Sequence, residues 1–341
     1  MIRRLWAALV CAALLLTGCA VQTDSPRQFT ATFLDLFDTV TTVVGRADSE
    51  ESFHAVARQI HDDLLDYHRL FDIYHDYEGL ANLKTVNDHA GKEPVEVDGR
   101  IIELLQACKE YHRTTNGRVN VAMGGVLRLW HEARTRGIND PRAAALPDED
   151  ALAEAGAHTD LNAVIIDPAA STVFISDPLV SLDVGAVAKG WAVEQAARRA
   201  PDGLLISVGG NVCATGPKDG QGTPWVVGIQ NVDGSENYLH TLYITQGCVV
   251  TSGDYQRYYV VDGKPYHHII DPDTLYPSRY WRSVSVICDH SGTADALSTA
   301  LFLLSAEEGQ ALLEQYDAQA MWVDGQGQRI YSPGFRDRIR T

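Results

Sequence analysis

Hydrophobic and polar positions alternate at the start of the chain's globular part and then recur with helical spacing. Residues 29–44 alternate polar and apolar side chains and end in β-branched residues, which predicts a strand or hairpin. Residues 49–72 carry an apolar side chain at each helical turn, which predicts a helix with Ser49 as its N-cap. Helices are also predicted over residues 99–115 and, in an acidic stretch, over residues 144–157.

Short apolar segments dominate the second half of the chain. They predict strands at residues 164–166, 173–175, 204–208, 225–230, 239–245, 249–251, 258–261, 283–287 and 320–323. Helical spacing predicts a short helix over 191–199 and a long one over 294–316. Consecutive strands with helices clustered elsewhere favour an α+β fold, with a largely antiparallel sheet core and flanking helices.

The N-terminus has the pattern of an export signal. Arg3 and Arg4 precede an apolar run over residues 5–16 that is too short to span a bilayer. The run ends in Leu16-Thr17-Gly18-Cys19, which resembles a bacterial lipobox, cleaved before Cys19 with that cysteine then diacylated. We therefore expect a signal peptide at 1–18, a lipidated cysteine and tether at 19–28, and one domain over 29–341. The expected location is the cell membrane, lipid-anchored on its extracytoplasmic face; the alternative is an ordinary secretory signal in which Cys19 is incidental.

Composition narrows the class of partner. The 341 residues are 45% hydrophobic and 21% charged, an ordinary globular balance, and carry a formal net charge of -17. Such a charge argues against nucleic acid or a bare anionic lipid surface as a partner. It would also repel a polyphosphate ligand, unless a bound divalent cation removes that conflict locally.

Cysteine spacing gives no sign of a zinc site. The six cysteines are Cys11, Cys19, Cys108, Cys213, Cys248 and Cys288, and no two form a Cys-x-x-Cys pair. The last four are expected to be buried free thiols, with one disulfide as the open alternative.

Asp295 and Thr299 are candidates for a magnesium site. They lie four residues apart at the start of a predicted helix, with Thr293 as its expected N-cap, so they share one helix face. Carboxylate and hydroxyl oxygens are ligands that Mg²⁺ prefers. The alternative interpretation is an acid that only compensates the helix dipole.

Other candidate residues lie at turns. Asp183 and Lys189 flank a strand-to-helix connection whose small residues, Gly185 and Ala186, let a ligand approach the backbone. Arg257 is a candidate phosphate partner, with a surface ion pair as the alternative. His268, directly before Ile-Ile-Asp-Pro, is a candidate general base because the ordinary pKa of histidine is near neutrality.

In their order along the chain, the segments at 181–190, 207–211, 251–257, 268–272 and 295–299 resemble the FAD:protein FMN transferases, the ApbE-type flavin transferases. The resemblance extends over residues 29–331 and implies a single catalytic unit of that type. It implies Mg²⁺ bound by Asp295, Thr299 and the carbonyl of Ala186. It implies the following contacts with FAD: Phe37, Tyr74, Ala122, Met123, Asp183, Lys189, His268 and Ile269.

The implied reaction transfers FMN from FAD to a threonine or serine hydroxyl of an acceptor flavoprotein through a phosphoester bond, with release of AMP. His268, Asp183 and Arg257 are the expected catalytic residues, and Asp271 or Asp183 could replace His268 as the base. Two departures from the family pattern are Asn120 in place of Asp and Leu275 in place of Gly, and the second is expected to alter loop geometry. The alternatives are an FAD pyrophosphatase that gives FMN and AMP, and a flavin-binding lipoprotein without catalysis.

Overall fold

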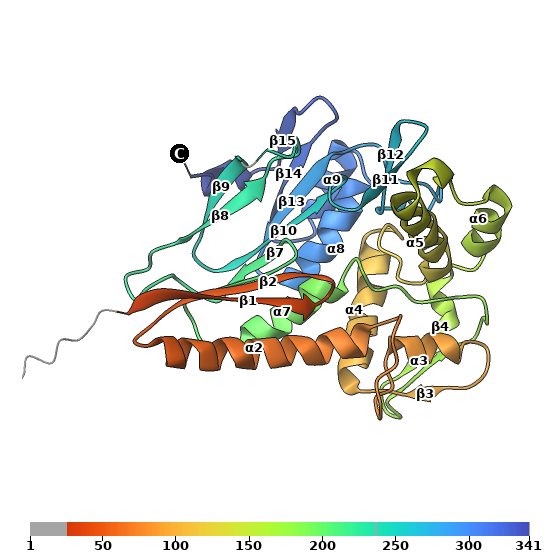
Figure 1. The fold of residues 1–341 in the computed structure, drawn as a ribbon, viewed down its shortest axis with the longest axis horizontal. Helices are drawn as coiled ribbons and strands as arrows, with labels where there is room; N and C mark the ends of the chain where they lie inside the picture. The colour runs from red at the N-terminus through yellow and green to blue at the C-terminus, as the bar shows by residue number, and fades with distance from the viewer. Residues whose placement is uncertain (1–25, 236, 341) are drawn as a thin grey trace, which may run out of the picture.

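An eight-stranded antiparallel sheet forms the centre of the computed structural model, which describes residues 26–235 and 237–340 (Figure 1). Its strands, in spatial order, are β1 (Arg27–Leu36), β2 (Thr39–Ala47), β6 (Leu204–Val208), β7 (Asn211–Ala214), β10 (Gly247–Gly253), β13 (Ser283–Cys288), β14 (Ala318–Val323) and β15 (Arg329–Tyr331). Each neighbouring pair is antiparallel. The predicted α+β class with a largely antiparallel sheet is confirmed.

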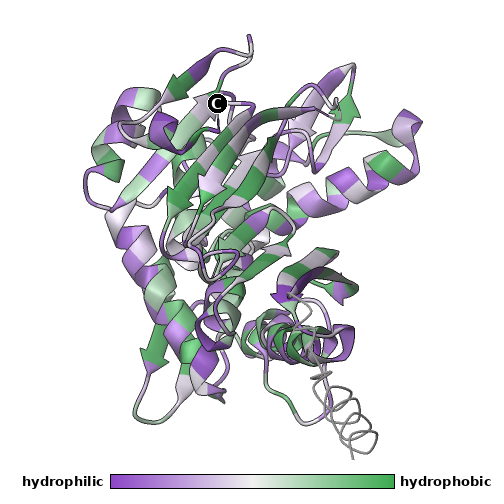
Figure 2. Ribbon diagram, turned by 90° about the vertical axis from the view of Figure 1, so that its left-hand side faces the viewer, coloured by the Kyte–Doolittle hydropathy of each residue, from purple (hydrophilic) through white to green (hydrophobic). Residues whose placement is uncertain are grey.

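Helices cover one face of this sheet. They are α2 (Glu50–Phe71), α4 (Gly99–Thr114), α7 (Ala188–Arg199), α8 (Ser291–Phe302) and α9 (Ala306–Leu313). Helix α2 packs on β1 and β2, α7 lies beside it and also contacts α8, and α4 packs against α2 (Figure 1). Their apolar faces and the sheet form one large core, and Figure 2 shows hydrophobic positions concentrated along the central strands.

A hairpin covers the opposite face of the sheet. Strands β8 (Trp225–Gln230) and β9 (Tyr238–Ile244) pair with each other, and β8 buries every second side chain, as expected for a strand with one solvent face. The buried side chains, with Phe335 of the short helix η3 (Phe335–Arg338), form a second core.

The remaining elements lie beside the sheet and its helices (Figure 1). Helices α5 (Gly124–Asn139) and α6 (Glu149–Gly156) pack with the hairpin of β11 (Tyr258–Val261) and β12 (Lys264–His267) in a third apolar cluster. The others are α3 (Leu83–Asp88), β3 (Val95–Glu96), β4 (Val164–Asp167), β5 (Thr172–Ile175) and the short helices η1 (Pro141–Ala143) and η2 (Leu161–Ala163). Among the residues described here, no helix is long and apolar enough to cross a membrane.

Several predicted boundaries are wrong for local reasons. The long helix over 294–316 is two helices, because Ser305 and Glu308 form a capping box that starts α9. Helix α8 begins at Ser291 with His290 as its N-cap, so Thr293 is not the cap. The predicted helix over 144–157 begins only at Glu149, since Asp148 caps it.

Two of the four cysteines form a disulfide. Cys213 on β7 and Cys248 on β10 are register partners on adjacent strands and are bonded to each other. The expectation of four free thiols is therefore wrong for this pair, because pairing of the strands brings distant positions together. Cys108 and Cys288 are free and buried, as expected.

Candidate active site

A cavity of about 860 Å³ lies where the sheet, α5, α7, α8 and the β11–β12 hairpin meet. This volume is within the usual range for a cofactor or small-molecule site. The predicted site residues that line it are Phe37, Tyr74, Met123, Asp183, Ala186, Lys189, Arg257, His268, Ile269, Asp295 and Thr299. Ala122 does not line it and is fully buried. The fold thus gathers residues from segments far apart in the sequence around one space.

The crossing of α7 and α8 builds the acidic side of the cavity. A Cβ added to Gly190 would lie 2.4 Å from the carbonyl oxygen of Ser291 and 2.5 Å from the Cβ of Asp295, so glycine permits this close approach. The Gly190 N–H donates to Asp295 Oδ2 at 2.8 Å. Asp295 therefore lies in the second turn of α8, held by the backbone of α7.

Asp295 is a buried carboxylate beside a lysine. Burial raises its pKa, while Lys189, the Gly190 N–H and Asn211 oppose that rise. Thr299 and Ala186 line the same cavity, so one carboxylate, one hydroxyl and one backbone carbonyl are candidate oxygen donors for a cation. The described residues contain no group of three or more His, Cys, Asp or Glu side chains that could hold a metal. The oxygen donors of Asp295, Thr299 and Ala186 fit Mg²⁺, which usually takes one or two carboxylates and completes its shell with water and substrate phosphate.

Asp183 and Lys189 lie on the tight connection into α7. Asp183 Oδ1 accepts from the Gly185 N–H at 2.9 Å, and Lys189 Nζ donates to the Gly185 carbonyl at 3.4 Å. Burial raises the pKa of Asp183. Both side chains are therefore anchored to one exposed glycine at the cavity wall.

The segment at 120–123 supports this connection from behind. Val121 accepts from the Asp183 N–H at 2.8 Å, and Met123 forms a parallel bridge with Ser181. Asn120 accepts from the Ala122 N–H at 2.9 Å and donates to the Thr159 carbonyl at 2.9 Å. A carboxylate could not make the second bond, which accounts for Asn120 in structural terms.

The two neighbouring histidines have different roles. His267 Nε2 donates to the Ser278 carbonyl at 2.7 Å, and its Nδ1 accepts from the Ile269 N–H at 3.2 Å, so both of its nitrogens are engaged. His268 Nδ1 lies 3.3 Å from the Arg257 carbonyl. Because a carbonyl oxygen only accepts, Nδ1 carries the proton in that bond and Nε2 keeps a free lone pair.

His268 and Arg257 stand at the two ends of the β11–β12 hairpin, which thereby brings them together. Burial, followed by the charge of Arg257, lowers the pKa of His268 to about 3. The imidazole is therefore neutral near pH 7, in the form that accepts a proton.

The turn between β1 and β2 presents Phe37 to the cavity. Phe37 and Asp38 both have a φ of 51°, as a two-residue hairpin turn with two left-handed residues requires. The Phe37 N–H donates to His68 Nδ1 at 3.1 Å. Tyr74 also lines the cavity, and its ring lies 5.7 Å from that of His131 on α5.

Leu275 keeps the conformation that glycine would adopt. Its φ is 60°, and its carbonyl accepts from Trp130 Nε1 at 2.8 Å. The turn therefore retains a left-handed residue, with the leucine side chain close to Gly156.

Arg134 and His131 on α5 are polar cavity residues that were not among the predicted site residues. Arg134 Nη2 donates to His131 Nδ1 at 3.1 Å, and both side chains line the cavity. The signal was present, because Val126, Trp130, Ala133 and Gly137 are buried at spacings of four, three and four residues. Within the described part of the chain, Arg134, Arg257 and Lys189 form no ion pair with a carboxylate.

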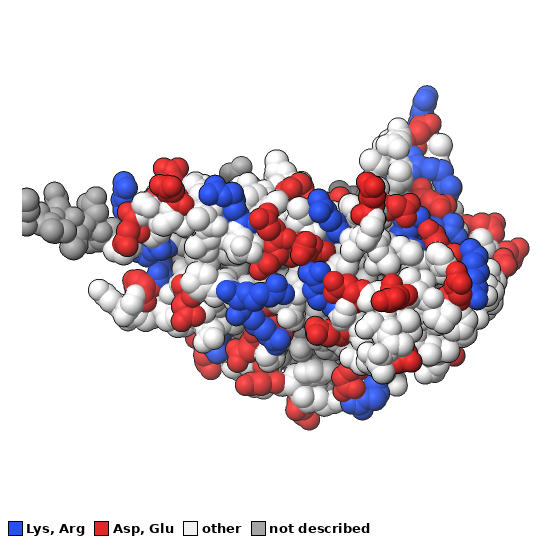
Figure 3. Space-filling view, turned by 90° about the horizontal axis from the view of Figure 1, so that it is seen from below, with Lys and Arg blue, Asp and Glu red and all other residues white. Residues whose placement is uncertain are grey.

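The cavity wall carries charges of both signs, as the outer surface does. On the face seen in Figure 3, acidic and basic side chains are interspersed. Inside the cavity, Lys189, Arg134 and Arg257 face a common space, together with Asp183 and Asp295. This arrangement suits a phosphate-containing ligand. The basic side chains can bind the phosphate directly, and a bound metal cation can link the phosphate to the carboxylates.

Comparison with known proteins gives a consistent result. Residues 37–322 match the model of the ApbE family. A FAD:protein FMN transferase of Treponema pallidum is 34% identical over 278 residues, which cover 76% of this chain and 75% of that protein. One of Klebsiella pneumoniae is 32% identical over 277 residues, covering 77% and 83%.

Solved structures agree with the fold. An ApbE protein of Thermotoga maritima superposes with a TM-score of 0.81 at 29% identity, covering 92% of this chain and 100% of that chain. The flavin transferase ApbE of Vibrio cholerae gives a TM-score of 0.75 at 22% identity, again covering 92% and 100%, and at this identity the likeness is one of fold.

Proposed function

This chain belongs to the ApbE family and is a FAD:protein FMN transferase, and from that premise we propose that its cavity binds FAD with Mg²⁺ and joins FMN to an acceptor hydroxyl through a phosphoester bond. The observation that carries this proposal is the meeting of Asp295, Lys189 and His268 around one cavity. A buried carboxylate, a cation and a neutral imidazole are the groups that such a phosphoryl transfer needs.

FAD is oriented by the two ends of the cavity. Lys189 and Arg257 attract the diphosphate, and Tyr74 and Phe37 provide aromatic surface for the isoalloxazine ring. Met123 and Ile269 contribute apolar wall. Ala122 acts indirectly, through the backbone that supports Met123.

Asp295, Thr299 and the carbonyl of Ala186 are the residues that would hold Mg²⁺. The ion, when bound, neutralises diphosphate charge and charge that develops in the transition state. This requirement accounts for a carboxylate placed against an anionic substrate in a chain of net charge -17.

His268 is the proposed base. The acceptor hydroxyl oxygen forms a bond to the FMN-side phosphorus, its proton passes to Nε2 of His268, and the bond to AMP breaks. Nε2 is free because the other ring nitrogen faces Arg257. Asp271 is a poorer candidate, since it pairs with Arg118 at 3.3 Å and does not line the cavity.

A direct test uses the soluble protein from Ala20 onward with FAD, Mg²⁺ and a threonine-containing acceptor peptide, analysed by mass spectrometry. We expect a peptide that gains the mass of FMN minus water, with AMP released in equal amount. AMP and free FMN with an unmodified peptide would favour the pyrophosphatase alternative. Intact FAD would favour a binding protein without catalysis.

We also propose that the chain is a lipoprotein at the extracytoplasmic face of the cell membrane. The support is Arg3, Arg4, the apolar run and the Leu-Thr-Gly-Cys19 sequence, all outside the described residues. The Cys213–Cys248 disulfide agrees with an oxidising compartment. Labelling with palmitate should mark the intact protein and not a Cys19→Ser variant, and equal labelling of both would contradict this proposal.

A further inference from the structure

The loop between α2 and α3 carries Tyr74 to the cavity, and one carboxylate organises it. Asp72 Oδ1 accepts from the Tyr74 N–H at 2.6 Å and the His75 N–H at 3.1 Å. Its Oδ2 accepts from His75 Nδ1 at 2.9 Å and the Tyr77 hydroxyl at 2.8 Å. These four bonds use the accepting capacity of a carboxylate, and every donor lies within five residues of Asp72.

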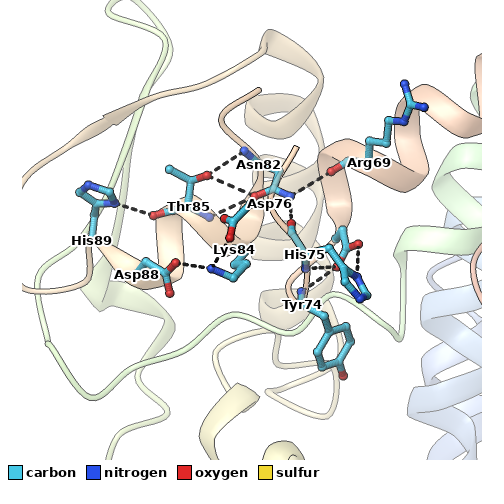
Figure 4. Close-up of polar contacts among 10 residues, drawn as sticks. Arg69, Tyr74, His75, Asp76, Asn82, Lys84, Thr85, Asp88 and His89 are labelled. Atoms are coloured by element: carbon cyan, nitrogen blue, oxygen red, sulfur yellow. Dashed lines mark hydrogen bonds and ion pairs between the residues drawn. The ribbon is translucent and has the colours of Figure 1, made fainter. Parts of the chain in front are cut away.

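Asn82 fixes the far end of the same loop. It is fully buried, and its Nδ2 donates to the carbonyls of Arg69 at 3.2 Å and His75 at 2.9 Å. Its Oδ1 accepts from the Thr85 N–H at 3.1 Å, which caps α3. The loop is thereby tied to the last turn of α2 at one end and to α3 at the other (Figure 4).

Tyr74 itself has little to hold it. Its side chain points away from the polar network in Figure 4, and the residue is 54% exposed. Outside its own loop, its ring contact is with His131 at 5.7 Å. The orientation of the ring therefore depends on the backbone that Asp72 fixes.

We propose that Asp72 is a positioning residue, which acts through Tyr74 to hold the flavin end of the cavity in its binding geometry. The inference rests on the proposed function, in which Tyr74 contacts the isoalloxazine ring. A loop ordered before binding spares FAD the entropy cost of ordering it. Asp72 lines the cavity, but both of its carboxylate oxygens are engaged within the loop, so we expect it to raise the affinity for FAD through Tyr74.

The test is a double-mutant cycle on FAD affinity, with FAD and Mg²⁺ added to the whole protein and binding followed by flavin fluorescence. We expect Asp72→Ala to raise the dissociation constant about tenfold, as loss of preorganisation would. Adding it to Tyr74→Ala should cause no further loss, because both changes remove the same interaction. Additive effects, or an Asp72→Ala protein with unchanged affinity, would overturn the inference.

Two variants separate positioning from folding. In Asp72→Asn, the amide oxygen still accepts from the two backbone N–H groups. The new NH₂ group can donate to the Tyr77 hydroxyl oxygen and to His75 Nδ1, both of which can act as acceptors. We therefore expect a dissociation constant within about threefold of the wild-type value. Asp76→Ala is the matched control. It removes a 75%-exposed carboxylate of the same loop that, among the residues the structure describes, pairs with Lys84 alone, and affinity should not change.

The Tyr74→Ala variant alone tests the premise that Tyr74 contacts the isoalloxazine ring. If Tyr74→Ala binds FAD as tightly as the wild type, the placement of the flavin at Tyr74 is wrong and this inference falls with it. If Tyr74→Ala weakens binding and the cycle is additive, the placement stands and the role of Asp72 alone is refuted.

Discussion

Asp295 is a buried carboxylate with a single backbone donor, so most of its charge is left to the cavity. We predict that Asp295→Asn lowers AMP release and FMN transfer together by about a hundredfold or more, because the amide cannot balance the charge of Mg²⁺. The measurement is product formation at graded Mg²⁺ concentrations.

A matched control is Asp63→Asn on α2, a largely buried carboxylate that pairs with Arg199 away from the cavity. It should leave the Mg²⁺ dependence unchanged. Activity of Asp295→Asn in metal-free buffer would refute the metal assignment.

His268 gives the fold a pH dependence with a defined sign. Burial and the charge of Arg257 lower its pKa to about 3 in the folded protein, against an ordinary value of 6.5. As pH falls from 6.5 toward 3, His268 therefore becomes protonated in the unfolded chain but not in the folded one. Proton binding then favours the unfolded chain, so the free energy of unfolding decreases across this pH range from its value above pH 6.5.

The variant His268→Gln has no such group. We predict that its melting temperature rises relative to the wild type as pH is lowered from 7 to 4.5, measured by thermal unfolding in matched buffers. A difference between the two proteins that stays constant with pH would contradict the depressed pKa.

At the scale of elements, the crossing of α7 and α8 depends on Gly190. We predict that Gly190→Ala destabilises the protein by about 1–3 kcal/mol, because the added methyl must displace the backbone at Ser291 or the side chain of Asp295. Gly220→Ala, where a Cβ meets nothing within 4 Å, should be nearly neutral. Equal unfolding midpoints in denaturant for the two variants would count against this close packing.

Elements with strong periodicity could be predicted from the sequence. The helix over 49–72 and its Ser49 cap agree with α2, because seven of its side chains are buried along one face. The break between α8 and α9 was missed because apolar residues continue at helical spacing across it. The signal for the break is the capping box that Ser305 and Glu308 form at the start of α9. Strand β7 was not predicted, because it is short and follows Gly209 and Gly210.

The candidate site could be predicted where a motif marks it. His268 was separated from His267 by resemblance alone, and the structure supplies a reason, since backbone groups occupy both nitrogens of His267. Arg134 carries no motif and reaches the cavity only through the packing of α5. The disulfide depends on the pairing of β7 with β10, which no local pattern encodes.

At the scale of the whole molecule, the disulfide joins two central strands that are 35 residues apart in sequence. We predict that Cys213→Ser with Cys248→Ser lowers the free energy of unfolding by about 2–4 kcal/mol, chiefly by freeing the unfolded chain. Denaturant unfolding with and without reductant measures this effect. A wild type that is insensitive to reductant when unfolded would contradict it.

The contrast between an acidic chain and a cavity with Lys189, Arg134 and Arg257 has a kinetic consequence. At low ionic strength the net charge of -17 repels an approaching dinucleotide over a Debye length of about 10 Å or more, while the cavity cations act only at close range. Added salt should therefore speed the arrival of FAD, whereas for most phosphate-binding proteins it slows arrival. Encounter with FAD would therefore be fastest at high ionic strength, which makes the salt concentration a determinant of the association rate.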